Sequence, residues 1–268
     1  MEDGKISKKK HFTVHPAVIS VWAAVIAVGH LLPTFPIMGT GGTFSLSTIL
    51  YPLSGIFFGP LAGALCSAAG GFIGSLIAPY TAWMGLGTFI VGTTTAFTTG
   101  CIAWGKWPPV AVSSAGNFII NGGIIVYITG TVLWFTQDIG RSVIRLPLFF
   151  YGLGFVVMII TIIFSRRMFA CKNQWSKFPA IWLCSFSGLI GGATIGNFFS
   201  LVLYKQPKEI WMILTITAPI ERAIFASAAM LAGAPLISGL NKIGIFTGPQ
   251  SDAYENIFSS EKGVSNED

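Results

Sequence analysis

Charged residues are scarce in this sequence of 268 residues. Asp, Glu, Lys and Arg make up 10% of the chain, whereas hydrophobic residues make up 53%. Soluble globular proteins carry roughly 25% charged residues, so this composition excludes a water-soluble fold. The few charges gather in the N-terminal tail, in short connections and in the C-terminal tail, with long uncharged runs between them. We therefore predict an all-α fold, a polytopic bundle of membrane helices.

Patterns that support catalysis or metal binding are also missing. The sequence has three histidines and four cysteines, and neither type clusters at the spacing of metal ligands. It contains no HExxH, GxSxG or P-loop motif, so it offers no sign of a zinc protease, a serine hydrolase or an ATP site. No basic face with interleaved aromatic residues indicates nucleic-acid binding. We expect no enzymatic activity, no metal and no cofactor, and any ATP-driven work requires another subunit.

Eight apolar segments are predicted to form the membrane helices. A bilayer core of about 30 Å requires roughly 20 apolar residues per helix. The second and third segments meet at Gly59-Pro60 and could form one bent element, and the last could include a reentrant or surface piece after Pro235. We expect a single transmembrane domain over 16–240, between a basic tail at 1–15 and a flexible tail at 241–268. The eight segments cover residues 16–32, 44–58, 60–78, 83–103, 110–135, 146–165, 180–204 and 210–240.

The distribution of lysine and arginine predicts the orientation of these helices, because loops rich in these residues stay on the cytoplasmic side. With both termini inside, the eight spans place eleven basic residues on the inner side and four on the outer side. Arg222 lies within a span. We therefore predict a plasma-membrane protein with both termini in the cytoplasm. The four outer residues are Arg141, Arg145, Lys205 and Lys208.

Glu221 and Arg222 are the ionisable residues predicted at membrane depth. Adjacent helix positions do not face each other, so spacing alone does not make them an ion pair. An ionisable side chain at this depth costs at least about 2.5 kcal/mol on insertion scales and needs a cavity or a partner. Pro219, just before them, removes a backbone donor. The pair either binds a ligand or couples to ions, or it locks helices together through Asn or Ser partners.

Three asparagines are further candidates for the same site. Asn117 and Asn121 are four residues apart and therefore share a face of the predicted fifth helix. Asn197 lies in another glycine-rich span. These amides either line a polar cavity that also contains Glu221 or Arg222, or form hydrogen bonds between helices.

Aromatic residues gather near the predicted outer boundary of the membrane. Tryptophan and tyrosine are enriched there as interfacial anchors, which is one interpretation. The other is stacking on a planar ligand, and on this interpretation Trp83 and Trp211 join the predicted substrate site. The aromatic residues of this region are Tyr80, Trp83, Trp134, Tyr204 and Trp211.

Small residues recur at four-residue spacing in several segments. Lipid tails provide no hydrophobic drive between helices, so glycine on one face permits close backbone approach and dispersion contacts. Ala23 and Ala27 form a similar pair in the first span, where they either pack internally or dock a partner subunit. The glycine series are Gly55, Gly59 and Gly63, then Gly70 and Gly74, then Gly188, Gly192 and Gly196.

The stretch GGTFSLSTILYPLSGIFFGPLAGALCSAAGGFIGSLIAP, residues 41–79, resembles the substrate-binding S components of energy-coupling factor vitamin transporters. In that family an outer loop leads into an apolar helix that ends in a G-P-x-x-G turn, followed by a glycine-rich helix and a proline. Gly59, Pro60 and Gly63 match this turn. Weaker similarity continues over 83–100 and 217–237, so about half the chain is covered. Six helices are usual in the family, and residues 136–204 could be an insertion that adds helices to this core.

The resemblance implies a subunit that takes up a small vitamin-like molecule from outside, in a complex with a transmembrane T subunit and two ATPase subunits. Ala23 and Ala27 match the A-x-x-x-A motif with which such proteins contact the T subunit. The chain lacks the Met-His start of the nickel and cobalt members, which disfavours a metal substrate. Two alternatives remain: a self-contained secondary transporter or channel in which Glu221 couples to protons or sodium, and a membrane-embedded assembly subunit with no ligand.

Overall fold

The computed structural model describes residues 16–37, 42–105, 121–142, 145–171, 174–205, 207–242 and 248–249. These residues form an α-helical bundle, which confirms the predicted fold class. Three short 3-10 turns accompany the helices: η1 (Pro79–Thr81) follows α3, η2 (Gly85–Gly87) precedes α4, and η3 (Gln174–Ser176) precedes α9. The helices are α1 (Pro16–Gly29), α2 (Ser47–Phe58), α3 (Pro60–Ile77), α4 (Thr88–Trp104), α6 (Gly122–Thr136), α7 (Asp138–Ser142), α8 (Arg145–Ala170), α9 (Lys177–Tyr204) and α10 (Lys208–Lys242).

Helix length separates the elements that are long enough to cross a membrane from those that are not. Within the described residues, α3, α4 together with η2, α8, α9 and α10 are long and apolar enough to span a bilayer. Helices α1, α2 and α6 have 14, 12 and 15 residues. At 1.5 Å per residue they are about 21, 18 and 22 Å long, shorter than a bilayer core of about 30 Å. The bundle is thus a multi-pass membrane fold, and the count of eight spans stays a prediction.

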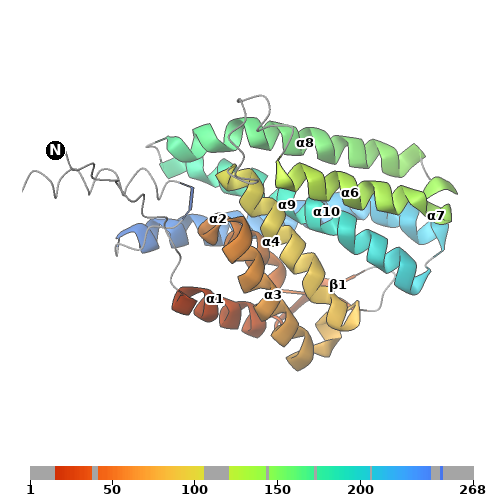
Figure 1. Ribbon diagram of the computed structural model, residues 1–268, viewed down its shortest axis with the longest axis horizontal. Coiled ribbons are helices and arrows are strands. Elements are labelled where there is room, and N and C mark those ends of the chain that lie inside the picture. Colours follow the sequence, from red (N-terminus) through yellow and green to blue (C-terminus); the bar gives the residue numbers. More distant parts are fainter. Residues whose placement is uncertain are drawn as a thin grey trace, which may run out of the picture.

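Helix α9 holds the two sides of the bundle together. It packs against α4, α6, α8 and α10, while α1 and α8 lie on opposite sides of the molecule (Figure 1). A Cβ atom at Gly188 or Gly192 would collide with Thr99 or Thr95 of α4. Glycine at these positions therefore lets the backbones of α4 and α9 approach closely, as the four-residue spacing predicted.

The Gly59-Pro60 junction separates two helices. Gly59 has φ 84°, a backbone conformation that favours glycine. Pro60 is the first residue of α3, where a backbone N–H would have no acceptor within the helix, so proline costs no hydrogen bond there. Helices α2 and α3 are therefore distinct elements. Helix α10, in contrast, runs without a break through Pro219 and Pro235 to Lys242, so no separate reentrant piece follows Pro235.

A two-stranded antiparallel hairpin follows α1, in the connection between the first two predicted membrane segments. Strand β1 (Pro33–Pro36) pairs with β2 (Thr43–Ser45). An isolated hairpin is marginally stable, so contacts with the bundle must support it. Phe35 provides one such contact, because its ring stacks on that of Phe225 in α10 with the centroids 4.8 Å apart.

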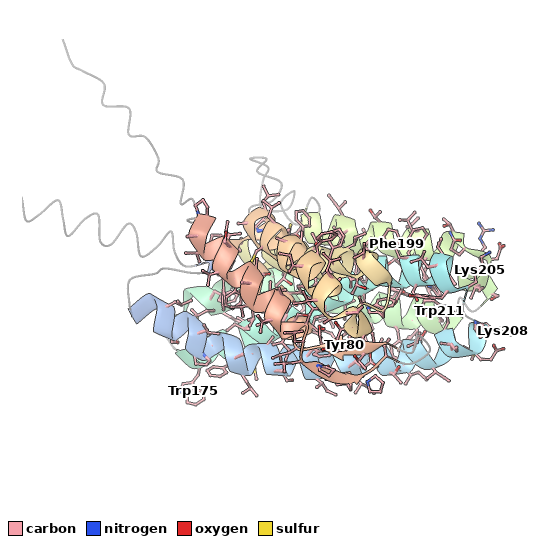
Figure 2. The ribbon with its side chains drawn as sticks, turned by 90° about the horizontal axis from the view of Figure 1, so that it is seen from below. Tyr80, Trp175, Phe199, Lys205, Lys208 and Trp211 are labelled. Carbon is pink, nitrogen blue, oxygen red and sulfur yellow. The ribbon has the colours of Figure 1, made fainter. Side chains whose placement is uncertain are left out.

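The connection between α8 and α9 and the connection between α9 and α10 lie at opposite ends of the bundle. Trp175, between α8 and α9, lies at one end, and Lys205 and Lys208, between α9 and α10, lie at the other (Figure 2). The predicted topology requires this arrangement. Which end faces the cytoplasm stays a prediction.

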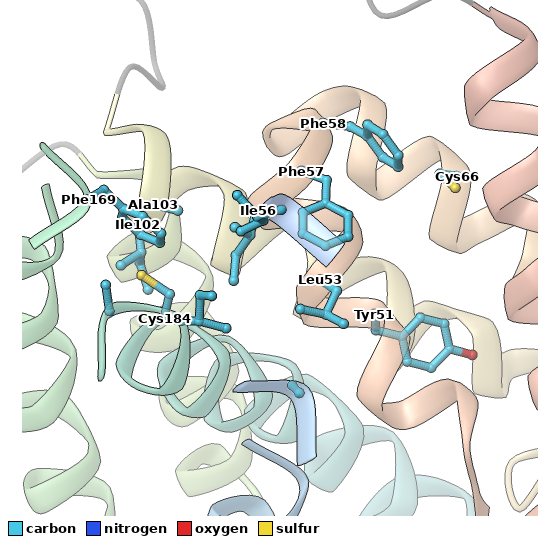
Figure 3. Close-up of a cluster of buried hydrophobic side chains, with 14 of the residues drawn as sticks. Tyr51, Leu53, Ile56, Phe57, Phe58, Cys66, Ile102, Ala103, Phe169 and Cys184 are labelled. Carbon is cyan, nitrogen blue, oxygen red and sulfur yellow. The ribbon is translucent and has the colours of Figure 1, made fainter. Parts of the chain in front are cut away.

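The main hydrophobic core lies where α2 meets α4 and α9. Leu53, Ile56 and Phe57 of α2 are fully buried there, together with Ile102 of α4 and Cys184 of α9 (Figure 3). Cys66 and Cys101 are buried as well, and none of the four cysteines forms a disulfide. The buried cysteines act as small apolar packing residues, as expected from the sequence.

Candidate functional site: two adjoining cavities

A cavity of about 110 Å³ lies between α4, α6, α8, α9 and α10. We call it the aromatic cavity, because aromatic side chains from several elements form much of its wall. Asn197, Thr215, Glu221 and Arg222 add polar groups to this wall. Its aromatic wall residues include Phe44, Trp83, Tyr127, Trp134, Tyr151 and Trp211.

Helix α10 contributes one continuous face to the aromatic cavity. Trp211, Thr215, Ala218 and Arg222 are spaced by three or four residues, which places them on the same side of a helix. Pro219 has no N–H group, so the carbonyl oxygen of Thr215 lacks its usual helical donor. The Pro219 position therefore adds backbone polarity to the part of α10 that carries the two ionisable side chains.

Arg222 is the cation of the site. Its guanidinium carbon lies 5.0 Å from the centre of the Phe44 ring, within the range of a cation–π interaction. Its Nε atom is buried and has no hydrogen-bond acceptor, and no salt bridge to the side chain forms among the described residues. Glu221 also lines the aromatic cavity and interacts with Arg222 through its charge, but the two side chains form no salt bridge. The Nε–H of Arg222 is thus left for a group that the described chain does not supply.

A second cavity of about 50 Å³ adjoins the first. We call it the polar cavity, because half of its wall residues carry a hydroxyl group. Phe44, Trp83, Val91 and Arg222 line both cavities, so Arg222 lies between them. The polar wall residues include Thr43, Ser45, Thr48, Thr81, Thr88 and Thr95.

A buried hydrogen-bond chain supports one wall of the polar cavity. His30, which is 1% exposed, contacts the Thr81 hydroxyl through Nδ1 at 3.1 Å and the Tyr51 hydroxyl through Nε2 at 2.7 Å. Thr81 donates its own proton to the Ala78 carbonyl at 2.9 Å. Nδ1 of His30 must therefore be the donor to Thr81, and Nε2 accepts from Tyr51. This neutral tautomer ties the end of α1 to α2 and η1.

The structure gathers most of the site residues that the sequence predicted. Glu221, Arg222, Asn197, Trp83 and Trp211 all line the aromatic cavity, although they come from three separate segments. The amide nitrogen of Asn197 donates to the Tyr151 hydroxyl at 3.0 Å. The cavity thus joins the predicted polar and aromatic residues.

Among the described residues, one predicted site residue does not take part in this arrangement. Asn121 caps the start of α6, where its side chain accepts from the Gly123 N–H at 2.9 Å and donates to the Cys101 carbonyl at 3.0 Å. It lines neither cavity, and its role is a contact between α4 and α6. Asn117 lies outside the described residues.

Sequence reasoning missed several residues of the cavity wall. Tyr127 donates to the Tyr151 carbonyl at 2.5 Å, and neither tyrosine was selected. Trp134 belongs to the aromatic residues that the sequence leaves open as anchors or stacking groups and is not among the predicted site residues. In the structure it is 1% exposed, and its ring centroid lies 5.6 Å from that of Trp211. The spacing of Tyr127 and Trp134, seven residues apart on one helix face, is the signal that could have paired them.

Ala23 and Ala27 do not form an outward-facing surface. They are 6% and 5% exposed, and a Cβ atom at Gly70 of α3 would lie 2.5 Å from the Ala23 carbonyl oxygen. The pair belongs to the close contact between α1 and α3. The structure therefore favours the internal-packing alternative over the prediction that this pair docks a partner subunit.

Comparison with protein families, curated proteins and solved structures finds no match to the chain. The interpretation of the site thus depends on its geometry, and the resemblance to vitamin-transporter S components stays a prediction. Among the described residues, no three His, Cys, Asp or Glu side chains form a group that could hold a metal ion. What the walls offer is a cation, hydroxyl groups, one carboxylate and aromatic faces, a set suited to binding.

Proposed function

We propose that the chain is a membrane-embedded substrate-binding subunit that captures a small vitamin-like molecule for ATP-driven uptake, with separate T and ATPase subunits. The observation that carries this proposal is Arg222, whose buried Nε has no hydrogen-bond partner and which forms no salt bridge among the described residues, in the wall of a cavity inside a membrane bundle. An ionisable side chain at such a depth is functional by default, because lipid cannot solvate it. The site belongs to a plasma-membrane protein with both termini in the cytoplasm.

The sequence limits the possible sources of energy for uptake. The chain has no P-loop, so it does not hydrolyse ATP by that route. A binding subunit can instead depend on ATPases that reach it through a T subunit. Because Ala23 and Ala27 are buried against α3, the contact with the T subunit must use another surface of the bundle.

A self-contained, ion-coupled transporter is the second candidate, and Glu221 is the observation that favours it. Its carboxylate lines the aromatic cavity and could bind a proton or sodium ion during transport. This candidate needs no partner subunit. The two functions therefore differ in whether the chain transports when it is alone.

Reconstitution distinguishes them. We expect affinity purification from native membranes in mild detergent to retain a membrane subunit and ATPases, and uptake by reconstituted vesicles to require ATP. The purified chain alone should bind its substrate without moving it across the bilayer. Uptake by the chain alone under a proton or sodium gradient would contradict the proposal and establish the ion-coupled transporter.

A further inference from the structure

The aromatic and polar cavities offer different chemical groups on the two sides of Arg222. We propose that the ligand is a small aromatic acid, with its ring system in the aromatic cavity and its carboxylate or phosphate group against Arg222 in the polar cavity. This inference rests on the proposed function, because it names the class of molecule that the same site would take. Its three parts are the ring site, the anion site and the position of Glu221.

The ring site is formed by aromatic side chains from three helices. Trp134 of α6, Tyr151 of α8 and Trp211 of α10 meet there, with centroids 5.7 Å apart for Trp134 and Tyr151 and 5.6 Å apart for Trp134 and Trp211. Aromatic rings prefer stacked or edge-to-face neighbours at such distances. A planar ring system can therefore add to this cluster, whereas a flexible polar chain would leave the aromatic faces without such contacts.

The anion site is the part of the polar cavity next to Arg222. Its wall contains this cation and hydroxyl groups but no carboxylate. The Thr88 oxygen accepts from the Met84 N–H at 3.0 Å, so its proton is available to a ligand. The cavity of about 50 Å³ has room for a small group, since one water occupies about 30 Å³ in the liquid. A carboxylate or phosphate there would neutralise the buried guanidinium.

Glu221 sets the direction in which the ligand lies. It lines the aromatic cavity and not the polar one, so a negative group in the aromatic cavity would meet like charge. The acid group therefore belongs on the polar side of Arg222. A ring N–H or hydroxyl group of the ligand can donate to Glu221 in the aromatic cavity.

Three naphthalene compounds of similar shape and different charge test this assignment. The probes are 2-naphthoate (anion), 2-naphthalenemethanol (neutral) and 2-naphthylmethylamine (cation), and binding to the full chain in lipid nanodiscs is measured by calorimetry. The wild-type protein should bind naphthoate most tightly and the amine most weakly. This comparison needs no substitution, so it does not depend on whether a variant folds.

Arg222→Gln tests the residue itself. It should weaken naphthoate binding by a factor of about 30 or more, the usual loss for a charged contact to a buried group, and leave the neutral probe unchanged. Arg222→Lys should recover part of the loss. Arg167→Gln is the matched control, because Arg167 is exposed and lines neither cavity, and it should bind all three probes as the wild type does.

Several results would overturn the assignment. These are equal or tighter binding of the amine, no binding of any probe, or an unchanged preference for naphthoate in folded Arg222→Gln. The proposed function is tested separately, by the ATP dependence of uptake. A preference for naphthoate in a chain that transports alone would support the ligand class and contradict the proposed function. ATP-dependent uptake with a preference for the amine would support the proposed function and contradict the ligand class.

Discussion

Gly63→Ala should loosen the close contact between α2 and α3. A Cβ atom at Gly63 would lie 2.6 Å from the Ser54 carbonyl oxygen and 2.8 Å from the Gly55 Cα atom, both in the backbone of α2. Ordinary contacts begin at 3.4 Å, so the oxygen must withdraw by 0.8 Å, the difference between 3.4 and 2.6 Å. A backbone atom cannot rotate away as a side chain can. The added methyl group therefore has to push α2 and α3 apart.

The energetic effect of this shift can be bounded. Overpacking costs about 1–3 kcal/mol, and the better helix propensity of alanine offsets up to about 1 kcal/mol. Because the clash is with backbone atoms, we expect a cost in the upper part of this range, about 2–3 kcal/mol. After the offset, the net loss of about 1–2 kcal/mol corresponds to a fall of about 2–8 °C in melting temperature for a chain of this size. Helix α2 contains fully buried core residues, among them Leu53 and Phe57, so its displacement should be felt throughout the bundle.

Thermal melting of the purified protein in detergent, followed by size-exclusion chromatography, measures the effect. Gly152→Ala is the matched control, because a Cβ atom at Gly152 would meet nothing within 4 Å. It should melt at or slightly above the wild-type temperature. If Gly63→Ala has the same melting temperature as Gly152→Ala, α2 and α3 can separate without loss of stability, and the claim that their close contact stabilises the bundle is wrong.

Three further predictions concern the polar contacts and the topology. Tyr51→Phe removes the donor to His30 Nε2 and should cost about 1–3 kcal/mol, measured by thermal melting, whereas an unchanged melting temperature would contradict the hydrogen-bond chain. Asn121→Ala removes the cap of α6 and should cost about 1 kcal/mol in the same assay, with ligand affinity unchanged; weaker binding would return Asn121 to the site. Cys171 is exposed, the other three cysteines are buried, and the predicted topology places Cys171 on the cytoplasmic side. An impermeant maleimide should therefore label the protein in inside-out vesicles but not in intact cells. Cys171→Ser should abolish this labelling. Labelling of intact cells would invert the predicted topology.

The sequence predicted most helices because the signals for their ends are local. Gly59-Pro60 marked the boundary between α2 and α3, and the structure places it there. The hairpin of β1 and β2 was missed because its strands are four and three residues long and β1 begins and ends with proline. Its stability comes from contacts with distant residues such as Phe225, which no local pattern reveals.

The candidate site was predicted in part for a related reason. Charge at membrane depth is expensive, so Glu221 and Arg222 stood out without any structure, and both line the aromatic cavity. Tyr127 and Tyr151 did not stand out. In a membrane helix that is apolar on all sides, hydrophobic periodicity does not separate the lipid-facing surface from the interior, so aromatic wall residues look like any others.

Two further predictions changed for reasons of geometry. Asn121 was paired with Asn117 on the assumption of one helix through both, but α6 begins at Gly122, and Asn121 has an extended backbone. For Ala23 and Ala27 the sequence leaves internal packing and a partner contact open, and the burial of both residues favours internal packing. A small-residue pattern indicates that a helix packs closely, but it does not indicate which helix is its neighbour.

Mass spectrometry of the molecules that the purified protein retains shows directly whether the aromatic cavity holds a small molecule. Ala193 lines this cavity, so Ala193→Phe would fill it, whereas Gly152→Ala adds a methyl group away from it. We expect one small molecule that copurifies with the wild type and with Gly152→Ala and is absent from folded Ala193→Phe. Retention of the same molecule by Ala193→Phe, or no retained molecule in the wild type, would contradict this expectation.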